Sequence, residues 1–172
     1  MAAWPGEVAY QALCWALQDA ETVQRYRSKV VTVPGSSCSW WSGAVSGRGH
    51  GRFWLAAVQG RDMVVIAHRF GYGLEHGPEA LLSTRVLGHR CDNTLCQRIG
   101  AGHVEASTQL QNRREWAARR VLAGNPLGDR RGARGRARAL RDAVRAGREL
   151  FETVEAAGRP PGRQMPLWEQ DE

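Results

Sequence analysis

The chain has 172 residues, and its 24 basic side chains against 17 acidic ones give a net charge of +7. This length allows one domain with a hydrophobic core, and a hydrophobic content of 42% with seven tryptophans excludes disorder over most of the chain. No apolar run approaches the roughly 18–20 residues of a membrane span, and no secretory signal is evident, so we expect a cytoplasmic protein. In that compartment the four cysteines are expected to be thiols or metal ligands rather than disulfides.

The first part of the chain has the pattern of a helix followed by short strands. Apolar side chains at helical spacing over 6–24 predict one N-terminal helix. A β-branched run at 30–33 ends in a turn, after which the segment that begins Cys38-Ser39-Trp40-Trp41 is strand-like. Two further runs, 52–58 and 63–67, are separated by turn residues. With the segment from Cys38 they predict a three-stranded meander.

The second part alternates short helices and strands. A helix is expected over 68–76, and a short return strand over 103–106. Thr108 and Gln111 have the spacing of a capping box, which predicts a helix from there to about residue 123. A last amphipathic helix is expected to carry an apolar stripe of Leu140, Val144, Phe151 and Val154.

Three residues of one short segment have the side chains and spacing of metal ligands. Cys91 and Cys96 are separated by four residues, and His103 follows seven positions after Cys96. Such a set binds one tetrahedral Zn²⁺ ion if a fourth ligand is present, and Cys38 is the candidate. The alternative for Cys38 is an ordinary buried core cysteine, which is common for this residue type.

Several motifs follow one another between residues 38 and 116: Cys38-Ser-Trp-Trp, Gly49-His-Gly-Arg-Phe, Ala67-His-Arg, Gly88-His-Arg-Cys-Asp-Asn-Thr-Leu-Cys, His103-Val and Asn112. A histidine lies two residues before the first cysteine of the pair, and an asparagine lies nine residues after the zinc-binding histidine. This order and spacing resemble those of the zinc-loop HNH endonucleases, close to the His-Cys box homing endonucleases.

The resemblance implies an α+β fold with a ββα-metal nuclease core, preceded by the meander and flanked by N- and C-terminal helices. It implies that His89 is the general base, because a neutral imidazole can take a proton from water near pH 7. It implies that Asn112 is the protein ligand of a catalytic Mg²⁺ or another divalent ion. The alternative for Asn112 is a solvent-facing helix residue. The structural Zn²⁺ would be one per chain.

An arginine that neutralises the phosphate in the transition state is expected, and the family pattern does not fix which one. Arg52 and Arg61 on the hairpin are the main candidates, with Arg69 and Arg90 as further ones. For the other histidines, His68 is expected to be structural, and His50 and His76 to be solvated in turns. The segment between Cys96 and His103 lacks the proline usual in the family, which leaves its conformation open.

The charge is concentrated near the C-terminus. Between residues 113 and 148 there are twelve arginines and three acidic residues, a local net charge of +9. Such a block predicts a polyanionic partner, DNA first, and a homodimer on a palindromic target is a further expectation. The alternative is a surface helix whose stripe packs on the domain or on a second subunit. The expected DNA contacts are Arg48, Arg90, Arg113, Arg114, Arg119 and Arg120.

The tail contains a short segment, Gln164–Trp168, similar to peptides that bind the bacterial sliding clamp. The alternatives are a chance occurrence and docking of this segment on the nuclease domain.

From these observations we expect a metal-dependent DNA endonuclease of HNH type that leaves 5′-phosphate and 3′-hydroxyl ends. Two alternatives stay open: a zinc-stapled DNA-binding protein without activity, and a nuclease that acts on RNA. The expected parts are an N-terminal helix over 1–30, the nuclease domain over 31–123, a basic linker with an amphipathic helix over 124–157, and a flexible tail over 158–172.

Overall fold

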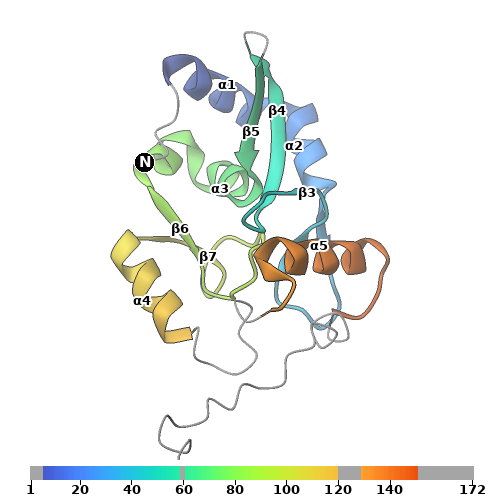
Figure 1. Ribbon diagram of the computed structural model, residues 1–172. Helices are drawn as coiled ribbons and strands as arrows, with labels where there is room; N and C mark the ends of the chain where they lie inside the picture. The colour runs from blue at the N-terminus through green and yellow to red at the C-terminus, as the bar shows by residue number, and fades with distance from the viewer. Residues whose placement is uncertain (1–5, 59–60, 120–128, 151–172) are drawn as a thin grey trace, which may run out of the picture.

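A computed structural model describes residues 6–58, 61–119 and 129–150 of the chain (Figure 1). Helices combine with antiparallel sheets, so the expected α+β class is confirmed. No helix within these ranges is long and apolar enough to cross a membrane. The sliding-clamp segment Gln164–Trp168 and the expected tail lie outside the described residues.

Two helices form the N-terminal part, where the sequence predicts one. α1 (Gly6–Gln18) and α2 (Ala20–Arg27) are separated at Asp19. Asp19 has extended backbone angles, and its carboxylate accepts a hydrogen bond from the backbone N–H of Thr22 at 2.8 Å. An aspartate in this conformation caps the first free N–H groups of a new helix. The expected single helix over 6–24 is therefore wrong, because Asp19 starts a second helix.

The expected meander is wrong in one strand. β2 (Ser39–Trp41) pairs with β1 (Val30–Thr32), whereas the three-stranded sheet is formed by β3 (Ala44–Val45), β4 (Gly51–Val58) and β5 (Arg61–Ile66). The physical reason is that both edges of β2 are already used. On one side it pairs with β1, and on the other Trp41 donates its backbone N–H to the carbonyl of Leu95 at 2.9 Å.

A kinked helix leads from the three-stranded sheet to a second hairpin. α3 (Ala67–Ser83) is interrupted at Gly77, whose φ of 86° requires a residue without a side chain. The helix expected over 68–76 therefore ends where the sequence predicts, at Gly77-Pro78, and a short second helical segment follows directly. The hairpin consists of β6 (Val86–His89) and β7 (Val104–Ser107).

Two basic helices follow the hairpin. α4 (Gln109–Arg119) begins after Thr108, whose hydroxyl accepts a hydrogen bond from the backbone N–H of Gln111 at 3.1 Å, as the capping-box spacing predicts. α5 (Gly132–Arg145) packs on β2 and β3 with Leu140 and Val144 buried. Phe151 and Val154 of the expected stripe lie outside the described residues. The two helices lie on opposite sides of the loop that follows β6 (Figure 1).

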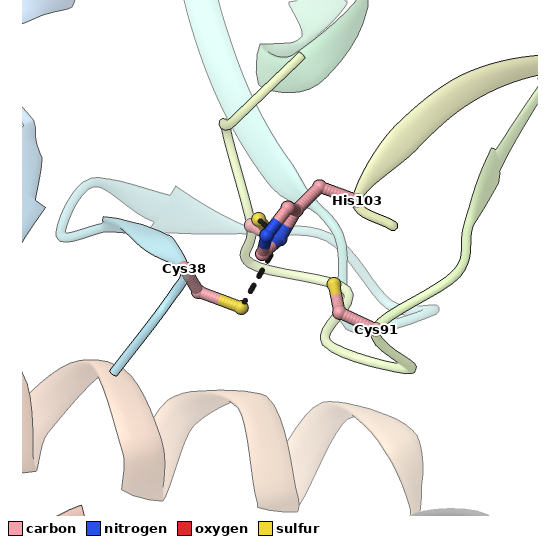
Figure 2. Close-up of side chains that lie close together, drawn as sticks. Cys38, Cys91 and His103 are labelled. Atoms are coloured by element: carbon pink, nitrogen blue, oxygen red, sulfur yellow. Dashed lines mark hydrogen bonds between the residues drawn. The ribbon is translucent and has the colours of Figure 1, made fainter. Parts of the chain in front are cut away.

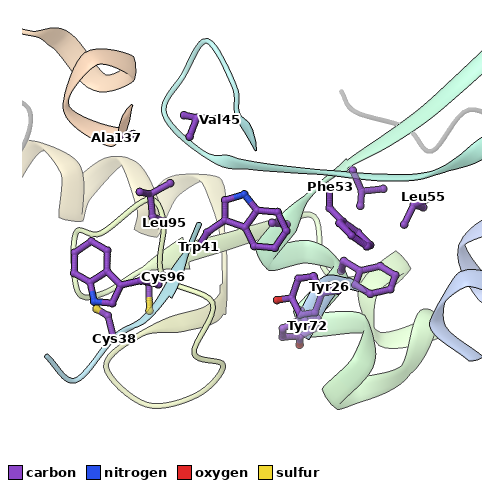
Figure 3. Close-up of a cluster of buried hydrophobic side chains, with 14 of the residues drawn as sticks. Tyr26, Cys38, Trp41, Val45, Phe53, Leu55, Tyr72, Leu95, Cys96 and Ala137 are labelled. Atoms are coloured by element: carbon purple, nitrogen blue, oxygen red, sulfur yellow. The ribbon is translucent and has the colours of Figure 1, made fainter. Parts of the chain in front are cut away.

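The core is built around aromatic rings that come from four different elements (Figure 3). Trp41 is fully buried, and its ring lies 5.6 Å from that of Tyr26 and 6.0 Å from that of Phe53. The Phe53 ring in turn lies 4.9 Å from that of Phe70. A Cβ atom on Gly51 would lie 2.6 Å from the Trp41 ring, so this ring packs directly on strand backbone. β2, β4, α2 and α3 therefore share one continuous core.

We expect Trp41→Ala to lower the free energy of unfolding by about 3–5 kcal/mol, because it removes a buried ring from the centre of this core. Trp15→Ala is the matched control, since Trp15 is 57% exposed on α1 and its loss is expected to cost about 0.5 kcal/mol or less. Urea unfolding followed by far-UV circular dichroism measures both. A similar loss in the two variants would contradict the placement of Trp41.

Candidate functional site

Four potential metal ligands converge from distant parts of the chain. Figure 2 labels three of them, Cys38, Cys91 and His103. The ligand atoms of Cys38, Cys91, Cys96 and His103 all lie within 4.8 Å of one another. His103 Nδ1 lies 3.8 Å from the Sγ atom of Cys38 and 3.5 Å from that of Cys96. The four-residue set predicted from the sequence is therefore brought together, and Cys38 belongs to it.

The distances fit a tetrahedral ion. Zinc bonds of about 2.3 Å to sulfur and 2.1 Å to nitrogen place the two ligand atoms about 3.6 Å apart when they meet at a tetrahedral angle. The observed sulfur-to-nitrogen distances of 3.5 and 3.8 Å bracket that value. The cluster could thus bind a metal ion such as zinc. The alternative for Cys38 is an ordinary buried core cysteine. Cys38 is indeed buried in the core, but its sulfur also lies with the other three ligand atoms.

Strand pairing explains why Cys38 meets the loop. The segment after Cys91 lies antiparallel to β2, with Trp40 bridging to Cys96. Gln97 donates its backbone N–H to the carbonyl of Ser39 at 2.7 Å. Cys38, which directly precedes β2, therefore lies beside Cys96. This pairing involves residues separated by more than fifty positions, so no local pattern predicts it.

The ends of the loop are closed by a second set of contacts. Arg90 donates its backbone N–H to the carbonyl of His103 at 2.7 Å. The Glu105 carboxylate accepts from the backbone N–H of Gly102 at 2.7 Å and from Nε of Arg90 at 3.2 Å. One acidic side chain thus joins the first and last turns of the loop. The missing proline between Cys96 and His103 does not prevent closure, because these hydrogen bonds shape the loop instead.

Three thiols at this distance influence one another's ionisation. The pKa of Cys38 is lowered because the thiols of Cys91 and Cys96 donate hydrogen bonds to it. The pKa of Cys91 and that of Cys96 are raised for the reciprocal reason, since each lies beside the Cys38 sulfur. A second thiolate is therefore costly without a cation. A dication would remove this penalty, which is the electrostatic reason why a Cys₃His set suits a metal.

His89 lies at the end of β6 and faces two other imidazoles. Its Nε2 atom lies 3.2 Å from Nδ1 of His68, the second residue of α3. The rings of His89 and His68 are 4.5 Å apart and nearly perpendicular, and the ring of His50 is 5.8 Å from that of His89. We call His50, His68 and His89 the histidine cluster. His68 has the buried, supporting position expected for it.

The chain leaves strand geometry directly after His89, as separate roles for His89 and Cys91 require. β6 ends at His89, and Asp92 has a left-handed backbone with φ of 53°. In a continued strand the side chains of residues 89 and 91 would point to the same side. The turn directs Cys91 to the metal-ligand set while His89 belongs to the histidine cluster.

His50 is not the solvated turn residue that the sequence suggested. Its ring lies 5.6 Å from that of His68, and burial lowers its pKa, with the charge of Arg48 adding to the shift. The turn before it is held by Thr94, whose hydroxyl donates to the carbonyl of Gly49 at 2.8 Å. The sequence carries no signal for this position. Along β4 the core residues alternate from Phe53, which places His50 on the face away from the core, and its ring contacts there are with His68 of α3 and His89 of β6.

The histidine cluster is neutral near pH 7. Burial lowers the pKa of His89 to about 3, with His50 adding to the shift and the Cys38 sulfur opposing it. Burial also lowers the pKa of His68 well below its ordinary value, and the neighbouring His89 and His50 contribute. A neutral imidazole keeps one nitrogen lone pair, so such a ring can accept a proton or bind a cation.

The candidate arginines occupy different places. Arg52 is exposed at the end of β4 next to His50, whereas the backbone of Arg61 pairs with Val58 at the other end of the hairpin. Six residues of strand separate the two ends, which is about 20 Å. Arg69 is used structurally, because its guanidinium donates to the carbonyls of Leu81 and Thr84 at 3.2 Å.

Arg90 points away from the histidine cluster toward acidic groups. Its guanidinium forms ion pairs with Glu105 of β7 and with Glu115 of α4. These contacts tie the hairpin to the helix that follows it. The charge of Arg90 is thus balanced within the protein, which gives this residue a structural role.

Asn112 lies on α4 above the strand that carries His89. A Cβ atom on Gly88 would lie 3.6 Å from Oδ1 of Asn112, so the carboxamide oxygen is close to the β6 backbone. The side chain is otherwise exposed, as are those of Arg113 and Arg114 beside it. Arg48 is exposed in the turn before His50. Arg120 and the side chain of Arg119 lie outside what the structure describes.

Comparison of the chain with family models, with curated proteins and with solved structures gives no match.

The lowered pKa of His50 makes stability depend on pH. The unfolded imidazole titrates near pH 6.5 and the folded one lower, so the unfolded chain binds the proton first as the pH falls. The contribution of His50 to stability is therefore fully present above about pH 6.5 and is lost at lower pH. We expect His50→Gln to flatten the fall in the free energy of unfolding between about pH 7 and 5, by up to about 1.4 kcal/mol per pH unit.

Urea unfolding at each pH measures this slope. His76→Gln is the matched control, because His76 is an exposed histidine of α3 that lies outside the histidine cluster. Proton competition for the Cys₃His set acts equally in all three proteins and cancels in the comparison. Identical slopes in wild type and His50→Gln would contradict the burial of this ring.

Proposed function

We propose that the protein is a metal-dependent DNA endonuclease of the HNH type, with a ββα-metal core formed by β6, β7 and α4. The observation that carries the proposal is the place of His89. A neutral imidazole ends a strand, two residues before a metal-ligand cysteine, and the next helix brings a carboxamide oxygen over the same strand. A protein that only binds DNA has no need of this combination.

In this proposal His89 is the general base. Its low pKa keeps the ring neutral at the working pH, and His68 within 3.2 Å orients it. A ring held in this way can take a proton from a water molecule that attacks the scissile phosphate. Because burial makes His89 a weak base, the proposal also requires that the approach of the phosphate raises its proton affinity, since a nearby negative charge stabilises the imidazolium form.

Asn112 is the proposed protein ligand of Mg²⁺ through Oδ1. Its exposed carboxamide leaves room for water and phosphate oxygens, which suits an ion that keeps much of its hydration shell. When bound, magnesium supplies a Lewis acid at the scissile phosphate and at the leaving 3′ oxygen. Hydrolysis that breaks the bond between phosphorus and the 3′ oxygen leaves 5′-phosphate and 3′-hydroxyl ends.

Arg52 is the proposed phosphate-neutralising arginine, in preference to Arg61. Arg52 follows His50 by two positions, and its exposed side chain lies at the end of β4 that meets the histidine cluster. Arg61 begins β5 at the far end of the hairpin. Arg113 and Arg114 on α4, with Arg48 in the turn, are the proposed contacts to the DNA backbone around the site.

The Cys₃His set is proposed to hold one structural Zn²⁺ per chain. Four protein ligands complete a tetrahedral shell, which leaves no open position for chemistry. The proposed role of the ion is to hold the loop between β6 and β7, and through it the position of His89.

We expect wild type with Mg²⁺ to nick supercoiled plasmid DNA, and His89→Ala and Asn112→Ala each to lower the rate by about 10²-fold or more. Arg52→Ala is expected to lower it similarly, whereas Arg61→Ala, which removes the same charge, is expected to change it less than about threefold. An inert wild type with every divalent ion would refute the endonuclease and favour the DNA-binding alternative. Faster cleavage of RNA than of DNA would favour the RNA alternative.

Purified protein is expected to contain about one equivalent of zinc by elemental analysis. Cys91→Ser should lose most of this zinc and unfold at lower temperature, because the metal contributes directly to folding. Cys14→Ser is the matched control, since Cys14 of α1 lies outside the four-ligand set. Folded wild type without metal, or equal zinc content in Cys91→Ser, would contradict the proposed site.

A further inference from the structure

Four arginines share one flank of α5. They recur at intervals of four, three and four residues, which places them on one side of a helix over a length of about 16 Å. Three of them are exposed and the third in chain order is partly exposed. We call this set the arginine flank; it consists of Arg134, Arg138, Arg141 and Arg145.

Little acidic charge balances the arginine flank. Asp142 pairs with Arg141 at 2.8 Å, and Asp129 is used by Arg131 on another part of the helix. Within residues 6–58, 61–119 and 129–150, neither Arg134 nor Arg138 has an ion-pair partner. Arg145 donates from Nε to the carbonyl of Ser42 at 2.6 Å, which holds its side chain in place without neutralising its charge.

The buried face of α5 favours a polyanionic partner over an anionic membrane. Basic amphipathic helices bind anionic membranes by inserting an apolar face between the lipids. In α5 that face is occupied, because Ala137, Leu140 and Ala143 are at most 2% exposed against the protein. Only charge is presented outward. The arginine flank therefore suits a partner with repeated negative charge and no need for apolar contact.

The position of α5 connects the arginine flank with the histidine cluster. A Cβ atom on Gly49 would lie 2.7 Å from the carbonyl oxygen of Ala133, so the first turn of α5 packs on the turn that precedes His50. From this point the arginine flank leads away along the helix. Figure 1 shows α5 and α4 on opposite sides of the loop that carries Cys91 and Cys96. An extended polymer at His89 could therefore reach both helices.

We propose that the arginine flank binds the phosphate backbone of duplex DNA beside the segment held at His89. Each DNA strand carries one phosphate per about 3.4 Å of helix axis, so a row of guanidinium groups about 5 Å apart meets phosphates along its whole length. A single phosphate would engage only part of the row. The choice of DNA rests on the proposed function, whereas the contact itself does not require catalysis.

The test compares two double variants of the full chain in a His89→Ala background, in which cleavage is expected to be slow. Arg134→Gln with Arg138→Gln removes two charges from the arginine flank. Arg27→Gln with Arg85→Gln is the matched control and removes two exposed arginines from α2 and from the residue before β6. Binding of a labelled duplex of about 30 base pairs is measured by anisotropy over a range of salt concentrations.

We expect the slope of log K against log salt to fall by about 1.8 in the arginine-flank variant, because each lost phosphate contact removes about 0.9. The control is expected to keep the slope of its parent. Equal slopes in the arginine-flank variant and its parent, or an equal fall in the control, would overturn the proposal. So would binding to anionic lipid vesicles that Arg134→Gln with Arg138→Gln abolishes while DNA binding is unchanged.

Failure of this inference and failure of the endonuclease are separable. If wild type cuts plasmid DNA but the slope does not change, the arginine flank is wrong and the endonuclease stands. If wild type cuts nothing and the slope still falls as expected, the arginine flank binds DNA in a protein that is not a nuclease.

Discussion

The structure of the loop between β6 and β7 depends on one constraint, which is the convergence of Cys38, Cys91, Cys96 and His103. The loop between β6 and β7 has little apolar content of its own, and its path is set by the four ligands, by pairing with β2 and by the carboxylate of Glu105. A chain segment of this kind is too short to fold alone. Crowded thiols would repel one another as thiolates, which raises the pKa of Cys91 and that of Cys96, and a bound cation would remove this repulsion.

The same loop creates the environment of the histidine cluster. It begins directly after His89, and Thr94 attaches it to the turn before His50. Burial then keeps His50, His68 and His89 uncharged. The four-ligand set also acts on His89 directly, because the charge of the Cys38 sulfur opposes the fall in the pKa of His89. The loop also contacts the aromatic core directly, because Gln97 accepts a hydrogen bond from the hydroxyl of Tyr26 at 3.0 Å.

α4 is held in place although little of its surface is buried. Most of its side chains are exposed, including Leu110 at 60% and Trp116 at 49%. It is held by the Thr108 cap and by the ion pair between Glu115 and Arg90. A helix that carries Asn112, Arg113 and Arg114 on an open surface is suited to a large polar partner, and this agrees with the proposed function. α5 differs, because one side is firmly buried and its charge is confined to the rest.

The sequence predicted features that depend on residues close together in the chain. The spacing of Cys91, Cys96 and His103, the cap at Thr108 and the stop at Gly77-Pro78 each depend on residues within one loop or one helical turn, and all three are present in the structure. The resemblance to HNH endonucleases supplied roles for His89 and Asn112, which stay predictions. Aspartate is a preferred helix N-cap residue, so Asp19 also indicated the start of a second helix. The apolar spacing continues across Asp19, which is why one helix was predicted.

Only the tertiary structure decided which distant residues meet. It showed that Cys38 lies beside Cys96, that β2 leaves the expected meander, that the half-buried His50 packs against His68, and that Arg52 rather than Arg61 lies at the end of β4 near the histidines. The physical reason is common to all four. Hydrogen-bond pairing of strands and the covering of one face by a loop join residues far apart in sequence, whereas periodicity and spacing report only on neighbours along the chain.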